Sequence, residues 1–336
     1  MAVTIKDLAR MTGFSTSTVS RVLSRRGYTD EQTRKIVEEA VRESGYVYKP
    51  VANRRNSIDI VMLIMEQVSN ETYTQESTGI SSVFDAMDIM HVGAYGERYH
   101  SEKLEAYMKR AIKSHFKGMI LFSPIETPSF QRIMQNCSIP CVALNRPIDS
   151  LEMDTVCMDN KAAGRMAVEY LISRGHRRIV HLAVTVNSSG RHRMRGYLDA
   201  MEQAGLPVEE NDVVQVDDSY EAGVNAGYLI AVAKTDVTAV YATNELIARG
   251  MIEGLRKCGK RVPEDISIIS TDNTTMSIIS PPHLTTVCCN TYQMGAEAAQ
   301  LFIERCQNPL GQKKQLFLPP ELVERDSVMD IRSHCE

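Results

Sequence analysis

From residue 58 onward, the chain alternates short apolar runs with longer amphipathic segments. The apolar runs have the length of buried strands, and the segments between them have the spacing of helices. Strands are predicted at residues 60–65, 91–95, 119–122, 141–144, 179–183, 213–216, 239–242, 266–270 and 284–288. Helices are predicted at residues 102–115, 160–173, 191–204, 222–233, 245–257 and 293–306. Such alternation favours parallel sheets covered by helices on both faces, and it is too long for one typical doubly wound sheet, so we expect two lobes.

The first 23 residues predict two short helices joined by a turn. Thr4 and Asp7 have the spacing of a capping box, and Gly13 can supply the turn after the first helix. Ser15 is well suited to cap the second helix, because its hydroxyl can accept a hydrogen bond from a free amide of the first turn.

The second helix has two chemically different faces. Val19, Val22 and Leu23 fall on one side at helical spacing, whereas Ser17 and Arg21 project from the opposite side. An apolar back and a polar front carrying a guanidinium are typical of a recognition helix that enters the major groove of DNA. The alternative is a small helical cap that binds no ligand.

A third helix is predicted after Thr29, which can cap it, and before Gly45, which can end it. Its apolar stripe can close a three-helix core and consists of Ile36, Val37, Ala40 and Val41. Residues 48–57 are basic and polar and follow no periodic pattern after Pro50, so they predict a linker whose cations can contact phosphates.

Several runs match recurrent segments of one protein family, in order along the chain. They are residues 4–9 (TIKDLA), 17–23 (STVSRVL), 45–46, 175–179, 193–197, 262–267, 284–287 and 322–327. On these runs the chain resembles the lactose-repressor/galactose-repressor (LacI/GalR) family of bacterial transcription regulators. The resemblance implies an N-terminal all-α helix-turn-helix headpiece and an α/β body similar to periplasmic binding proteins, with two Rossmann-like lobes.

The same resemblance implies the domain boundaries. The helix-turn-helix domain is expected at residues 1–48, the hinge at 49–57, the effector-binding and dimerisation domain at 58–330 and a tail at 331–336. Within the body, lobe one is expected at residues 58–158 and 291–318, and lobe two at 159–290 and 319–330. The chain would then cross between the lobes near 158–160, 289–291 and 318–320.

DNA contacts are expected from the outer face of the second helix, its flanks and the hinge. These residues are Thr4, Ser15, Thr16, Ser17, Thr18, Ser20, Arg21, Tyr28, Lys49, Asn53, Arg54 and Arg55. In the family, the hinge folds into a short minor-groove helix only on the operator, and its wedging leucine is matched here by Arg55. One headpiece reads too few base pairs for genomic specificity, so we expect a homodimer on a near-palindromic double-stranded operator. The tail is too short for a leucine-heptad tetramerisation helix.

Polar residues at the carboxyl ends of predicted strands indicate a small-molecule site, because ligands of parallel α/β sheets bind beyond those ends. Asn145, Asn244 and Asp272 hold such positions, and Arg193 opens a helix. These groups suit a polyhydroxylated or carboxylated ligand. The resemblance assigns effector contacts to Thr72, Tyr73, Asn145, Arg193, Asn244 and Asp272. The alternative for each residue is helix capping or a surface ion pair.

The chain departs from the family at one position of the effector site. A position where the family often stacks an aromatic ring on the effector is matched by Asp218, and the chain has no Trp. We expect a sugar or sugar derivative. Arg191 and Arg195 can simply solvate the helix that carries Arg193, and His176 is expected to have a capping rather than a catalytic role.

Charge is distributed unevenly along the chain. Residues 1–57 contain 11 Lys and Arg against 6 Asp and Glu, whereas the whole chain has a net charge of −4. A basic head on an acidic body predicts that only the head meets a polyanion.

Other functional classes lack their sequence signatures. The chain has no Gly-x-Ser-x-Gly, phosphate loop or His-Glu-x-x-His, so we expect no enzyme. The eight cysteines form no Cys-x-x-Cys pair, which favours buried thiols over a metal site, and we expect no cofactor. No signal peptide and no apolar run near 18 residues are recognisable, so we expect a cytoplasmic protein that makes no membrane contact.

Together these features predict a sequence-specific transcriptional regulator, a repressor, whose affinity for DNA is controlled by a small polar effector. The alternative is a solute-binding protein with the same body fold and no regulatory role. The basic head and the absence of a signal peptide argue against that alternative.

Overall fold

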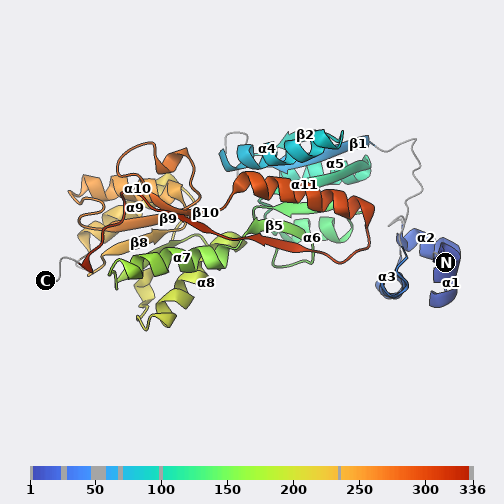
Figure 1. Cartoon of the computed structure of the whole chain (residues 1–336), viewed down its shortest axis with the longest axis horizontal. Coiled ribbons are helices and arrows are strands. Elements are labelled where there is room, and N and C mark those ends of the chain that lie inside the picture. The colour runs from blue at the N-terminus through green and yellow to red at the C-terminus, as the bar shows by residue number, and fades with distance from the viewer. Residues whose placement is uncertain are drawn as a thin grey trace.

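The computed structural model describes residues 3–23, 29–46, 58–66, 71–97, 101–233 and 236–332. Two α/β lobes lie side by side along the long axis of the molecule, and a small helical headpiece formed by the N-terminal residues lies at one end of it (Figure 1). The predicted fold class, a helical headpiece followed by a two-lobed α/β body, is confirmed.

The headpiece consists of α1 (Ile5–Thr12), α2 (Thr16–Leu23) and α3 (Glu31–Ser44). Thr4 and Asp7 form the predicted capping box on α1, and Gly13 ends that helix with φ 73°. The cap predicted for α3 is wrong by one residue: Asp30, not Thr29, accepts from the Thr33 amide at 2.8 Å. Asp30 caps α3 because its carboxylate reaches this amide while its own backbone remains extended.

A small apolar core joins the three helices. It consists of Leu8, Val19, Val22, Leu23, Val37, Ala40 and Val41. Ile36, predicted in the same stripe, is 40% exposed instead. Burial of one face of each helix leaves the opposite face of α2 in solvent.

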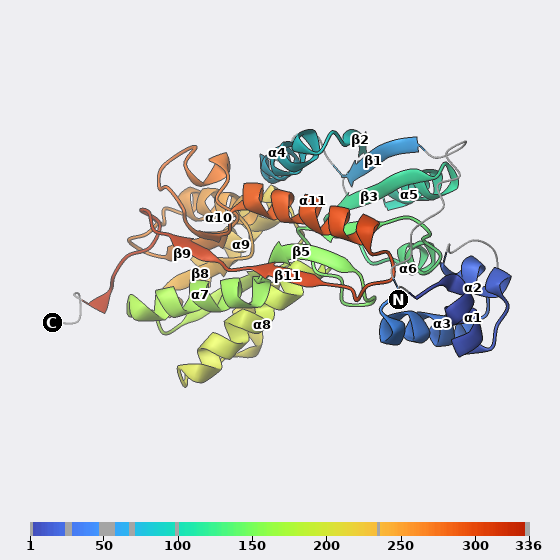
Figure 2. The same ribbon diagram turned by 45° about the vertical axis from the view of Figure 1, so that its right-hand side comes forward.

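Lobe one is built on a six-stranded parallel sheet. Its order is β11-β5-β4-β3-β1-β2, with β1 (Ile58–Met65), β2 (Met90–Tyr95), β3 (Phe116–Phe122), β4 (Cys141–Leu144), β5 (Asp154–Met158) and β11 (Gln315–Leu318). One face packs against α4 (Glu71–Ala86) and α11 (Thr291–Gln307), which run side by side in both views (Figures 1 and 2). The other face packs against α5 (Ser101–Lys113) and α6 (Pro128–Gln135).

The helices α4 and α11 approach each other closely through two glycines. A Cβ at Gly79 would lie 2.0 Å from the carbonyl oxygen of Tyr292, and a Cβ at Gly295 would lie 2.0 Å from that of Glu76. Only glycine permits this backbone contact.

Lobe two has a second six-stranded sheet, parallel except for its edge strand β12. Its order is β12-β10-β9-β8-β6-β7, with β6 (Ile179–Ala183), β7 (Val213–Gln215), β8 (Ala239–Ala242), β9 (Ser267–Thr271), β10 (Thr285–Cys288) and β12 (Glu321–Val323). The helices α7 (Asn160–Ser173) and α8 (Ser188–Gln203) cover one face. The opposite face packs against α9 (Tyr220–Val232) and α10 (Glu245–Lys257). Two short 3₁₀ helices, η1 (Glu210–Asp212) and η2 (Thr275–Ser277), complete this lobe.

The chain passes between the two sheets three times: from β5 to α7, from β10 to α11 and from β11 to β12. Among the α-helices and β-strands of the described ranges, β5, β11, β12, α4 and α6 were not predicted, and neither were the two 3₁₀ helices. The strands β11 and β12 have only 4 and 3 residues, so their pairing with distant strands, rather than a local pattern, defines them.

None of the helices in the described ranges is both long enough and apolar enough to cross a membrane.

Candidate functional site

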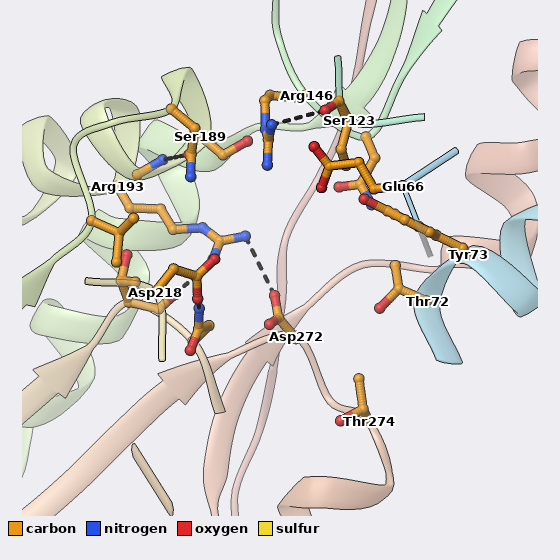
Figure 3. Close-up of a pocket in the computed structure, with 16 residues that line it drawn as sticks. Glu66, Thr72, Tyr73, Ser123, Arg146, Ser189, Arg193, Asp218, Asp272 and Thr274 are labelled. Atoms are coloured by element: carbon orange, nitrogen blue, oxygen red, sulfur yellow. Dashed lines mark hydrogen bonds and ion pairs between the residues drawn. The ribbon is translucent and has the colours of Figure 1, made fainter. Parts of the chain in front are cut away.

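A polar cleft of about 190 Å³ lies between the two lobes, and all six predicted effector residues line it. Lobe one contributes Thr72 and Tyr73 from α4 and Asn145 from the end of β4. Lobe two contributes Arg193 from α8, together with Asn244 and Asp272, which follow β8 and β9. Figure 3 shows Arg193 and Asp272 meeting at the cavity, with Thr72 and Tyr73 on the far wall.

The carboxyl ends of strands deliver three of these side chains, as the strand-end argument predicts: Asn145 follows β4, Asn244 follows β8 and Asp272 follows β9. Three residues directly after strands have a left-handed backbone: Ser123 with φ 45°, Asn145 with φ 72° and Asp272 with φ 129°. Such conformations are uncommon for residues other than glycine and often occur where a site fixes the direction of a side chain.

Arg193 is held by three groups of lobe two. Its Nε donates to Asn160 Oδ1 at 2.9 Å, and one terminal nitrogen donates to the carbonyl oxygen of Thr243 at 2.6 Å. The other terminal nitrogen lies 3.5 Å from Asp272 Oδ1. A guanidinium has five N–H donors, so a part of its donor capacity is left for a ligand.

Burial raises the pKa of Asp272 to about 7, although Arg193 favours the charged form. The nearby carboxylates of Glu245 and Asp218 contribute to this rise of the pKa. Asp272 therefore titrates near neutral pH, whereas an ordinary aspartate is fully charged there.

Asn145 is oriented by a buried carboxyl group of α4. Its Nδ2 donates to Glu76 Oε1 at 2.7 Å, and Glu76 is fully buried. Desolvation raises the pKa of Glu76 well above its ordinary value. Tyr73 is buried as well, and its ring meets Phe122 edge to face with centroids 5.5 Å apart.

Asn244 uses both ends of its amide within the protein. Its Oδ1 accepts from the Ile247 amide at 3.0 Å and so caps α10, while its Nδ2 donates to Asp218 Oδ1 at 2.7 Å. The capping alternative therefore applies to this residue.

On the headpiece, α2 presents a second polar surface. Thr4, Ser15, Thr16, Ser17, Ser20 and Arg21 are exposed and Thr18 is half-buried, while Val19, Val22 and Leu23 are buried beneath them. Ser15 caps the helix by accepting from the Thr18 amide at 3.1 Å, as predicted. The predicted DNA contacts Tyr28, Lys49, Asn53, Arg54 and Arg55 lie outside the described residues.

Comparisons with known protein families give one match in the headpiece and one in the body. Residues 4–48 match the family described as "Bacterial regulatory proteins, lacI family", and residues 168–328 match a periplasmic binding protein-like domain. The chain belongs to the LacI family of bacterial regulatory proteins. Its relatives are transcriptional regulators, and this LacI-family chain is a transcriptional regulator rather than an enzyme.

Two curated relatives of this LacI-family chain span almost its whole length. The HTH-type transcriptional regulator DegA of Bacillus subtilis is 29% identical, over 99% of this chain and 100% of DegA. The HTH-type transcriptional repressor CytR of Escherichia coli is 29% identical, over 97% of this chain and 96% of CytR.

Solved structures agree with this assignment. The transcriptional regulator CelR in complex with cellobiose superposes with a TM-score of 0.73 at 28% identity, covering 97% of this chain and 99% of CelR. The lac repressor dimer bound to operator and an anti-inducer has the same fold, with a TM-score of 0.72 at 23% identity over 98% of this chain and 100% of the repressor.

Sequence reasoning missed several lining residues of the LacI-family cleft. They are Glu66, Ser123, Arg146, Val184, Asn187, Ser189, Gly190, Thr243 and Thr274. Glu66 and Ser123 directly follow β1 and β3, and Arg146 is the second residue after β4, so the strand-end rule applied to every strand would have found them. Ser189 and Gly190 lie at the start of α8 and do not directly follow a strand, so this rule would not have found them.

Polar contacts join the lobes along the rim of the cleft. Asp149 of lobe one accepts from Arg191 at 2.9 Å and interacts with His192 at 3.1 Å, both on α8. On another part of the rim, the Thr275 amide donates to Glu71 at 2.7 Å. Arg191 therefore links the lobes, which corrects the expectation that it only solvates its helix. Arg195 is exposed.

The other chemically notable groups have structural environments. His176 is buried between Thr238 Oγ1 at 2.9 Å and the carbonyl oxygen of Met329 at 3.1 Å. Within the described ranges, no group of three His, Cys, Asp or Glu could hold a metal ion, and the seven cysteines there are free.

Proposed function

We propose that this regulator binds a near-palindromic DNA operator as a homodimer in the cytoplasm and represses transcription, with its affinity set by a small polar effector in the interlobe cleft. The observation that carries the proposal is the exposed polar face of α2, which stands on a compact helical headpiece ahead of a ligand-type cleft. A plain solute-binding protein would have no use for that headpiece.

The α2 face supports DNA reading on chemical grounds. A serine- and threonine-rich surface with one guanidinium can donate and accept at base edges in the major groove. We propose that Thr16, Ser17 and Arg21 contact base edges. We propose that a second group contacts the sugar-phosphate backbone of the DNA: Thr4, Ser15, Thr18, Ser20, Tyr28, Lys49, Asn53, Arg54 and Arg55. The basic balance of residues 1–57 supports these phosphate contacts.

The cleft supports effector control because its lining comes from both lobes. A ligand that binds there changes the balance between lobe arrangements if it binds one of them more tightly. We propose direct contacts from Arg193, Asp272 and Asn145, with Thr72 and Tyr73 shaping the wall. Asn244 would act by holding Asp218 in place.

Dimerisation is supported by the small size of the DNA-reading unit. One headpiece reads too few base pairs for genomic specificity, so two headpieces on a near-palindromic site are expected. Two copies of lac repressor likewise assemble on operator DNA in the solved complex.

The decisive experiment is selection of binding sites from random DNA with the full chain, followed by gel shifts at several salt concentrations. We expect a near-palindromic consensus bound by two chains, and an affinity for it that changes when a cleft ligand is added. Binding without any sequence preference would refute the proposal and favour the solute-binding alternative.

A further inference from the structure

We propose that the DNA-free chain holds its headpiece docked on lobe one, in an orientation that keeps an operator duplex away from Arg21, and that DNA binding requires release of this contact. The docking site on lobe one consists of Leu310, in the loop between α11 and β11, and the carboxyl end of α6. The inference rests on the proposed DNA-reading role of α2 and adds an autoinhibitory contact to it.

The headpiece core reaches the body through one apolar side chain. Leu310 packs against the cluster of buried residues that joins α1, α2 and α3. Among the described residues that pack on this cluster, Leu310 is the one that comes from the body, and it is half-buried. An apolar side chain placed against the core of another unit is a typical anchor of an interface.

The loop that carries Leu310 is held in shape by a buried guanidinium. Arg305 donates to the carbonyl oxygens of Gly311 and Gln312 at 2.7 and 2.8 Å. The same guanidinium is fixed by Asp154 of β5 at 2.6 and 3.0 Å. The loop is therefore preorganised, and docking of the headpiece costs little ordering of its backbone.

The second part of the contact places the reader helix near α6. Arg21 and Val22 of α2 line a cavity of about 120 Å³ together with Gln135, Asn136 and Cys137 at the end of α6. Figure 2 shows the headpiece beside the end of lobe one that carries α6. Arg21 remains exposed to water, but residues of lobe one lie across this cavity from it.

This placement is incompatible with DNA reading by α2. A recognition helix enters a major groove about 12 Å wide and has a sugar-phosphate backbone on each side of it. In the docked arrangement, the end of α6 takes up space that the duplex needs on the Arg21 side of the helix. A duplex therefore reaches Arg21 only after the headpiece has left lobe one.

The contact is open enough to be released. A second cavity, of about 260 Å³, is lined by Arg34 and Glu38 of α3 and, on the side of lobe one, by residues that include Glu152 and Lys313. Protein interiors are close-packed and contain few voids larger than a water molecule. Two cavities at one small interface indicate few close contacts, which suits a contact that DNA displaces.

The first test uses a variant of the full-length chain. Leu310→Asp places a charge in the docking contact and should release the headpiece. We expect faster amide hydrogen exchange at residues 134–139 without DNA, and at least tenfold tighter binding of the operator found by selection from random DNA. Leu198→Asp makes the same substitution at an exposed leucine of α8 in lobe two and should change neither quantity.

The second test needs no variant. If operator binding releases the headpiece, it uncovers the docking site, so residues 134–139 and 308–312 of the wild-type chain should exchange at least threefold faster in the operator complex than in the free protein. Slower or unchanged exchange at both segments would overturn the inference, and this measurement decides if Leu310→Asp unfolds the headpiece.

Two further results separate this inference from the proposed function. Wild-type or weaker operator binding by Leu310→Asp, with the headpiece helices still protected from exchange, would overturn the autoinhibitory contact and leave the DNA-binding function standing. If selection returned no preferred sequence, the proposed function would fall and with it the autoinhibitory role. The exchange difference between wild type and Leu310→Asp without DNA would then still show whether the headpiece docks.

Discussion

The guanidinium of Arg193 lies 3.5 Å from the carboxylate of Asp272 at the cleft, although 79 residues separate the two in sequence. One comes from α8 and the other from the turn after β9, so their meeting depends on the packing of lobe two. Both residues also line the cavity toward lobe one. The pair therefore lies at the wall of the interlobe cavity.

Replacing Arg193 by Ala should weaken effector binding about 10- to 100-fold, because a hydrogen bond to a charged group contributes about 1.5–3 kcal/mol. Operator affinity without effector should stay close to that of the wild type, since Arg193 lies in the body. Calorimetry with an effector found by screening, and gel shifts without it, would measure the two effects. Arg195→Ala removes an exposed guanidinium from the same helix and serves as the control. Wild-type effector affinity in Arg193→Ala would mean that the ligand binds elsewhere.

Replacing Arg21 by Ala should cost about 1–3 kcal/mol in operator binding and relax the preference at one base position in each half-site. The reason is that an exposed guanidinium on α2 can bind a guanine edge through two hydrogen bonds. Site selection with the variant would show the relaxed position. Lys35→Ala, on the exposed face of α3, is the control for loss of charge alone. An unchanged consensus would exclude Arg21 as a base reader.

Replacing Arg55 by Leu should increase the operator bend and flatten the salt dependence by roughly one unit per protomer. A leucine can wedge between base pairs, whereas an arginine can only lie in a narrowed groove or contact phosphates. Energy transfer between dyes at the ends of the operator reports the bend, and binding at several salt concentrations reports the slope. If neither the bend nor the salt dependence changes, Arg55 does not reach the groove.

Breaking the buried ion pair of lobe one should destabilise the body strongly. Arg305 donates to Asp154 at 2.6 and 3.0 Å, and both side chains are almost completely buried. Arg305→Met should lower the free energy of unfolding by about 3–5 kcal/mol, because the buried Asp154 carboxylate loses both hydrogen bonds from the guanidinium and keeps only Lys313 at 3.5 Å and the Lys314 amide at 3.0 Å. Urea denaturation measures this loss. Lys314→Ala removes an exposed pair with Glu304 and should cost less than about 1 kcal/mol. Equal losses in the two variants would contradict this account.

His181 should make the folded protein sensitive to acid. Its ring is fully buried between Tyr197 and Tyr241, with centroids 5.3 and 4.6 Å away, and burial lowers its pKa from 6.5 to about 4. The unfolded chain binds the proton between these pH values and the folded chain does not. Stability is therefore lost as the pH falls from 6.5 to 4, by about 3 kcal/mol in total.

His181→Phe keeps an aromatic ring in the stack and should lose less stability over this pH range than the wild type. The exposed His115, replaced by Asn, is the control. An NMR titration of the wild-type protein gives a direct measurement, since the His181 ring should remain neutral until about pH 4. A ring that gains its proton near pH 6.5 would disprove the assignment.

Much of the fold follows from local sequence. The capping box of Thr4 and Asp7, the cap at Ser15 and the apolar positions of α2 all lie within one or two helical turns, so short-range hydrogen bonds and periodicity suffice to predict them. The strands β4, β6 and β8 have the predicted bounds because each is a short apolar run buried along its whole length. The strand-end rule then identified Asn145 and Asp272 as residues of the cleft.

Only the tertiary structure decided which donors and acceptors remain for a ligand. The Asn244 side chain donates to Asp218 and accepts from the first turn of α10, and the Asn145 side chain donates to Glu76. The Arg191 guanidinium donates to Asp149 of the other lobe. The strands β11 and β12 likewise exist through pairing with strands far away in sequence. The physical reason is the same in each case. A hydrogen bond requires a short distance between two groups, and here folding brings together groups that are far apart in sequence. The free energy of burying a polar side chain likewise depends on neighbours that are distant in sequence, so a local sequence pattern does not reveal it.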